Sequence, residues 1–170
     1  MAAISWVLQT EPAQIATSTD VVLVRFTEPP PLSTFVAYRR ALDRVIESVG
    51  PERAALVHLA EVGPASRDRS ALERELKSLM RDYDGRIVAA SVVILTQGFL
   101  NAMVRSVAGL AIRAVRPRTK VALVDEIGAG AEHLARARGN RDATPMVRLI
   151  NQFREECVAH ALEAQKRVAS

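Results

Sequence analysis

The stretch from Arg86 to Arg118 most constrains what this chain can fold into. It opens with an apolar run, Arg86–Leu95, which has the length and the β-branched content of a buried strand. After Gly98 the apolar residues recur at helical spacing until Pro117 ends the pattern. A buried strand that leads directly into an amphipathic helix is the repeating unit of a parallel α/β sheet. We therefore expect further strands beside this one and helices against the faces of the sheet.

The remaining chain repeats this alternation. Short β-rich runs predict strands at Ile4–Gln9, Gln14–Thr19, Val21–Phe26, Ala54–Ala60 and Lys120–Val124. Helical spacing of apolar residues predicts helices at Leu32–Val49, Ser66–Tyr83, Ile127–Arg138 and Pro145–Val168. The predicted fold class is α/β, with a mixed, mainly parallel sheet, an N-terminal antiparallel hairpin and an extra C-terminal helix. Residues 1–139 form the expected α/β domain, and residues 140–170 form an amphipathic helical extension.

Composition sets limits on the protein class. The chain has 170 residues, of which 49% are hydrophobic, and this is enough material for a core without disulfides or metals. Cys157 is the only cysteine, which excludes an intrachain disulfide and suits a reducing, cytoplasmic setting. We see no signal peptide in the first residues and no apolar run long enough to span a bilayer. No metal or cofactor is expected.

The order of elements resembles a known family. The strings that carry the likeness are VVLVRF followed by a helix, AALVHLA followed by a loop and a helix, and RIVAASVVIL followed by a helix. KVALVDEIGAGAEHLARA completes the series, so that the likeness covers residues 4–139. This pattern is similar to STAS-type domains, the fold of anti-sigma-factor antagonists and of related STAS/SEC14-like bacterial proteins. The resemblance implies a non-enzymatic regulatory module that acts through a protein partner. Alternatively, it implies a small apolar or lipid-like ligand in a SEC14-like pocket beneath the helix Gly98–Val115.

The resemblance also points to a regulatory serine. Family members commonly carry a phosphorylatable residue at the start of the helix after the central strand, and the matching place here is EVGPASRDRS, residues 61–70. Ser66 is the nearest positional match and Ser70 is the second, although the family's Asp-Ser-x-Gly setting is absent. Both serines can equally serve as helix caps, since Ser70 and Glu73 have capping-box spacing.

A set of basic residues follows the central strand. Its members lie along and just beyond the helix Gly98–Val115, and they are Arg105, Arg113, Arg116, Arg118 and Lys120. Such a cluster can bind an acidic partner or a phosphate, or it can be a solvated face that complements the helix dipole. Aromatic residues for base stacking are not interleaved with it, so we do not expect a nucleic-acid partner.

No pattern of residues predicts catalysis. His58, His133 and His160 lie on three different elements, and His58 falls in an apolar strand, where a core histidine is the simpler interpretation. Gly128 and Gly130 follow a strand, but His133 stands where a dinucleotide-binding loop needs its third glycine. We therefore expect a protein that is not an enzyme.

The C-terminal helix allows two interpretations. Its apolar stripe, which includes Ile150, Phe153 and Cys157, must be buried somewhere. The helix can cover the sheet, or it can act as an arm through which two copies form a homodimer. The sequence does not decide between these two roles.

Overall fold

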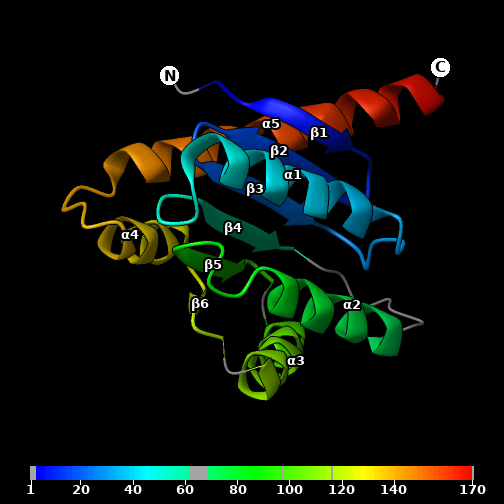
Figure 1. Ribbon diagram of the computed structural model, residues 1–170. Helices are drawn as coiled ribbons and strands as arrows, with labels where there is room; N and C mark the ends of the chain where they lie inside the picture. The colour runs from blue at the N-terminus through cyan, green and yellow to red at the C-terminus, as the bar shows by residue number, and fades with distance from the viewer. Residues whose placement is uncertain (1–2, 62–68, 97, 116, 170) are drawn as a thin grey trace.

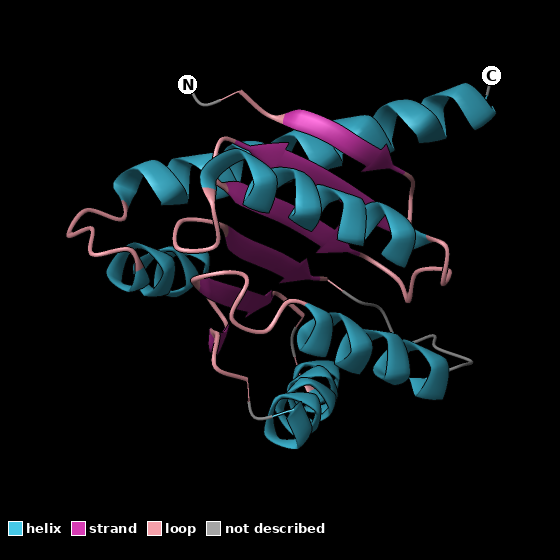
Figure 2. Cartoon of the chain, viewed as in Figure 1, coloured by secondary structure: helices cyan, strands magenta, loops and turns pink. Residues whose placement is uncertain are grey.

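The computed structural model describes residues 3–61, 69–96, 98–115 and 117–169 (Figure 1). Within these ranges the chain alternates strands and helices, as Figure 2 shows. The strands are β1 (Ser5–Gln9), β2 (Ala13–Ser18), β3 (Val21–Phe26), β4 (Ala55–Ala60), β5 (Ala89–Ile94) and β6 (Lys120–Val124). The helices are α1 (Thr34–Val49), α2 (Arg69–Asp82), α3 (Phe99–Val115), α4 (Ile127–Ala137) and α5 (Thr144–Ala169).

The six strands form one mixed sheet in the order β1-β2-β3-β4-β5-β6. β1, β2 and β3 pair antiparallel, whereas β3, β4, β5 and β6 pair parallel. The predicted fold class is therefore confirmed, with an antiparallel unit of three strands instead of a two-stranded hairpin. Each parallel connection passes through one helix, as parallel pairing requires.

The central strand is shorter than the sequence predicts. β5 begins at Ala89 instead of Arg86, because the preceding residues form a turn in which the Arg86 N–H donates to the carbonyl of Tyr83 at 3.0 Å. Gly85 occupies a positive φ of 72° in that turn, which glycine adopts without strain. Ile87 and Val88 therefore precede β5. Ile87 packs in the apolar cluster on one face of the sheet, and Val88 packs against the cluster on the other face.

Helices cover both faces of the sheet. α1 and α2 cover one face, where Phe35, Tyr38 and Leu42 of α1 pack on β2 and β3. α4 and α5 cover the opposite face, where Leu134 and Phe153 are fully buried. Since both faces are covered, every residue of β2, β3 and β4 is buried, including the polar ones. This explains why these strands are apolar runs instead of alternating ones.

The helix α5 packs against the sheet with only its first half. Leu149, Ile150 and Phe153 are buried, and the Phe153 ring lies 5.5 Å from the ring of Trp6 on β1. Cys157 is the last buried residue of the helix in the part that the structure describes. The C-terminal turns then extend past the sheet, as the red end of the ribbon shows in Figure 1. The helix is thus a cover over its first half and a projecting arm over its second.

We expect the substitution Gly130→Ala to destabilise the fold by about 1–3 kcal/mol. Gly130 lies in the first turns of α4, where the helix approaches β5 most closely, and an added Cβ would stand 2.9 Å from a methyl group of Val93. The Ser91 hydroxyl also donates to the Gly130 carbonyl at 2.9 Å, which fixes the helix in this place. Urea denaturation of the variant and the wild type measures the difference.

Gly128 provides the control for this prediction, because it lies two residues earlier in the same helix. An added Cβ at Gly128 has no atom within 4 Å. Gly128→Ala should therefore stabilise the protein by about 0.5–1 kcal/mol through helix propensity alone. Equal effects of the two substitutions would contradict the close packing of α4 on β5.

Candidate functional site

The carboxyl ends of β3, β4, β5 and β6 meet at one edge of the sheet, as parallel strands require (Figure 1). Between β5 and β6 the chain changes side. The connection after β5 leads to α3, beside α2, whereas the connection after β6 leads to α4 on the opposite face. Binding residues are disproportionately found on loops that a rigid scaffold positions, and the loops after these four strands are all held at this edge. This edge is therefore the place to look for functional side chains.

The first polar group at this edge is built around Glu61, the residue that follows β4. Its carboxylate accepts from Arg25 of β3, with 2.7 Å from Nε and 2.5 Å from Nη2 to Oε2. Its second oxygen accepts from Nε of Arg154 on α5 at 2.7 Å. Gln14 of β2 completes the set, because its side-chain oxygen accepts from Arg25 Nη1 at 3.2 Å. We call Gln14, Arg25, Glu61 and Arg154 the Glu61 network.

The charged side chains at the centre of the Glu61 network are largely buried. The side chains of Arg25 and Glu61 are only 10% and 15% exposed, so that each charge depends on the other. Arg154, at 46% exposure, reaches the same carboxylate from the solvent side. Beside the network, burial raises the pKa of the Cys157 thiol to about 12, and the nearby Arg25 lowers it only in part. Cys157 therefore stays protonated and unreactive at neutral pH, as a small hydrophobe does.

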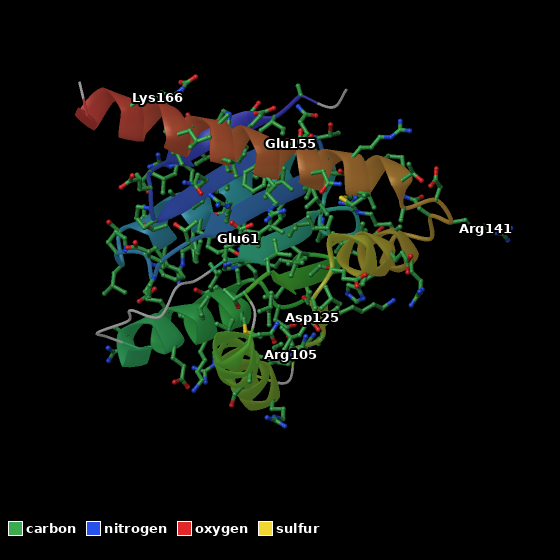
Figure 3. The ribbon with its side chains drawn as sticks, turned by 180° about the vertical axis from the view of Figure 1, so that it is seen from behind. Glu61, Arg105, Asp125, Arg141, Glu155 and Lys166 are labelled. Atoms are coloured by element: carbon green, nitrogen blue, oxygen red, sulfur yellow. The ribbon has the colours of Figure 1, made fainter. Side chains whose placement is uncertain are left out.

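The second polar group lies where the chain changes side between β5 and β6. Arg105 of α3 pairs with Asp125, the residue after β6, and its Nη1 also donates to the Leu123 carbonyl at 3.5 Å. Asn101, one turn earlier on α3, donates to Asp125 at 3.2 Å and to the carbonyl of Thr96 at 3.0 Å. We call Thr96, Asn101, Arg105 and Asp125 the Asp125 cluster; Arg105 and Asp125 are labelled in Figure 3.

Hydrogen bonding keeps the carboxylate of the Asp125 cluster ionised. The side-chain hydrogen bond from Asn101, followed by that from Arg105, holds the pKa of Asp125 below its ordinary value. The hydroxyl oxygen of Thr96 is buried and has no hydrogen-bond partner within the described chain. The Asp125 cluster therefore offers an ionised carboxylate, a guanidinium and a spare hydroxyl, a set that can orient a polar partner group but holds no paired nucleophile and base.

The basic residues that the sequence groups together are distributed over two edges. Arg105 lies at the carboxyl edge in the Asp125 cluster. Arg118 and Lys120 lie at the opposite edge, where β6 begins, and the Arg118 backbone N–H donates to Asp84. Arg113 is exposed in the last turn of α3, and Arg116 lies outside the described residues. Arg105 is thus separated from Arg118 and Lys120, because α3 runs from the carboxyl edge toward the opposite one, and a binding patch made of these residues stays a prediction.

The regulatory serines that the resemblance suggests cannot be placed at this edge. Ser66 lies outside the described residues, and of Ser70 the structure describes the backbone, at the second position of α2, but not the side chain. The apolar pocket expected beneath Gly98–Val115 depends largely on Leu100, Met103, Val107 and Leu110, whose side chains are likewise not described. Both expectations stay predictions.

The histidine predictions can be placed more closely. His58 is buried on β4 beside Phe26 and Tyr38, at 4.6 Å between its ring centroid and that of Phe26. It is thus a core histidine and takes no part in either polar group. His133 lies on the exposed side of α4, where its Nε2 is 3.1 Å from the Lys120 carbonyl.

The chain matches no protein-family model, no curated protein and no solved structure. Its chemistry must therefore be inferred from its own residues. Within the described ranges, no three His, Cys, Asp or Glu residues are arranged so that they could hold a metal ion. In the same ranges, no helix has both the length and the apolar character needed to cross a membrane.

Sequence reasoning overlooked most members of the two polar groups. Arg25 is the one charge in the run VVLVRF, and a lone arginine in a buried strand requires a carboxylate partner. Asp125 could have been recognised as a candidate, because it is a polar residue directly after a predicted strand. Glu61 and Asn101 gave no comparable signal, because a single polar residue in a loop or on a helix is ordinary.

Proposed function

We propose that the protein is a non-enzymatic regulatory module of the STAS-like type, which docks a protein partner at the carboxyl edge of its sheet. The observation that carries this proposal is a pair of exposed aliphatic side chains at the start of α1. Leu32 is 52% exposed and Val36 is 62% exposed. Leu32 lies in the turn that precedes α1 and Val36 lies in the first turn of α1, so both stand where the chain passes from β3 into α1.

Charged residues border this apolar pair. Arg39, one turn after Val36, reaches across to α2 and contacts Glu75 at 3.4 Å, the Ser78 hydroxyl at 3.0 Å and Asp82 at 3.1 Å. An apolar centre beside a polar rim is the usual build of a protein–protein interface. The same edge carries the Glu61 network and the Asp125 cluster, whose half-exposed Arg154 and Arg105 can pair with acidic groups of the partner.

We expect the double variant Leu32→Asp/Val36→Asp to lose the partner. Two carboxylates placed in the centre of the interface would stay unpaired on binding, and we expect at least about a 100-fold loss of affinity. Wild type and variant serve as baits in cell lysate, and cross-linked partners are quantified by mass spectrometry. Proteins recovered with the wild type should be depleted at least tenfold with the variant.

The double variant Val158→Asp/Leu162→Asp provides the matched control, because it introduces the same two charges at a pair of exposed aliphatic residues on α5. Leu162 is 54% exposed and lies on the other side of the sheet. This variant should retain the partner. Recovery of the same proteins with all three baits, or of unbound chain only together with turnover of a metabolite, would refute the proposed function.

A further inference from the structure

The projecting half of α5 carries the second pair of exposed aliphatic side chains. Among the described residues, the exposed large hydrophobic ones are Leu32 just before α1, Val36 on α1, and Val158 and Leu162 on α5. Val158 is 42% exposed and Leu162 is 54% exposed, and they lie four residues apart on the side of the helix that faces away from Phe153 and Cys157. A projecting helix of three turns gains little stability without packing. These residues therefore have no cover within the described chain, although they form a continuous apolar strip.

The neighbours of this strip are small. Ala159 is exposed and Ala161 is half-buried, and both flank the line from Val158 to Leu162. Small flanking side chains let a second helix approach closely. The charges are placed asymmetrically: Glu155 lies one turn before Val158, and Lys166 lies one turn after Leu162, both exposed (Figure 3).

We propose that α5 pairs antiparallel with α5 of a second copy of this chain, about a two-fold axis that passes midway between Val158 and Leu162. This arrangement places Val158 against Leu162 of the partner subunit, and the reverse contact follows by symmetry. It also brings Glu155 beside Lys166 of the partner subunit, once at each end of the strip. A parallel pair would instead place each charge beside its own copy, so that charge complementarity selects the antiparallel one.

The overhang makes this pairing sterically feasible. The last buried residue, Cys157, lies close to the proposed axis, and the turns beyond it extend past the sheet (Figure 1). In an antiparallel pair, the projecting turns of one copy lie along the first half of α5 in the other. The sheets of the two copies then lie toward opposite ends of the helix pair, so they do not collide. The inference does not depend on the proposed function, because it uses neither α1 nor the carboxyl edge.

Sedimentation equilibrium of the full chain tests the proposal. The strip is short, so we expect a dissociation constant in the micromolar range, with dimer populated at tens of micromolar. Leu162→Asp should raise the dissociation constant about 100-fold or more, because it buries a carboxylate against Val158 of the partner subunit, on each side of the two-fold axis. Leu32→Asp, an equal change just before α1, should leave the dissociation constant as in the wild type.

Charge reversal tests the register. Glu155→Lys alone and Lys166→Glu alone should each weaken the dimer several-fold, since each places two like charges together at both ends. The double variant Glu155→Lys/Lys166→Glu restores opposite charges and should return to the wild-type dissociation constant. A wild type that stays monomeric at hundreds of micromolar, a dimer that survives Leu162→Asp, or a double variant that is weaker than both single ones would each overturn the proposal.

Discussion

Replacing Glu61 by Gln is expected to lower the free energy of unfolding by about 3–5 kcal/mol, the largest effect of any single substitution proposed for this protein. The reason is Arg25, whose guanidinium is buried on β3 and whose only carboxylate partner among the described residues is Glu61. Gln14 offers only a neutral oxygen at 3.2 Å. Removing the carboxylate thus leaves an uncompensated charge in the interior, and urea denaturation at neutral pH measures the cost.

Two further variants separate the buried charge from the hydrogen bonds. Arg154→Ala removes the other partner of the same carboxylate, but Arg154 is half-exposed, so the loss should stay below about 1 kcal/mol. Arg25→Met together with Glu61→Gln removes both charges and should be less destabilising than Glu61→Gln alone. If Glu61→Gln costs no more than Arg154→Ala, the carboxylate does not hold Arg25 in place.

The carboxyl edge shows where sequence reasoning succeeds and where it stops. The fold class followed from the alternation of apolar runs and helical periods, which burial on both sheet faces enforces. The sequence did not predict which face of the sheet α4 and α5 cover, because an apolar stripe shows that a helix is buried but not on which face. That choice is made by α1 and α2, which already occupy the first face.

The basic residues show a second limit. Arg105 and Arg113 are close in sequence and both lie on α3, yet eight residues of helix separate them by about 12 Å along its axis. Since the helix runs along the sheet, Arg105 lies near one edge of the sheet and the last turn of the helix, with Arg113, lies toward the other edge. A cluster seen in sequence is therefore a cluster in space only when the helix runs across the binding surface instead of along the sheet.

We expect the protein to lose stability as the pH falls from 6.5 to 4, and we assign this loss to His58. Burial lowers the pKa of His58 from its ordinary value of 6.5 to about 4 in the folded state. The unfolded chain therefore binds a proton below pH 6.5, whereas the folded chain stays neutral there until about pH 4. The contribution of neutral His58 to the free energy of unfolding is fully present above pH 6.5. It falls by about 3 kcal/mol in total between pH 6.5 and pH 4, and it changes no further below pH 4.

Urea denaturation at several pH values between 7.5 and 4.5 tests this assignment. His58→Gln should flatten the dependence, because glutamine does not titrate, although loss of the contact at 3.4 Å between His58 Nδ1 and the Tyr38 hydroxyl lowers stability at every pH. Asp84 and Asp125 have a pKa below the ordinary value in the folded state, so their contributions disappear only at lower pH and leave the window clear. The double variant His133→Gln/His160→Gln should keep the wild-type slope. A slope that survives in His58→Gln would mean that the buried imidazole is not the group that senses pH.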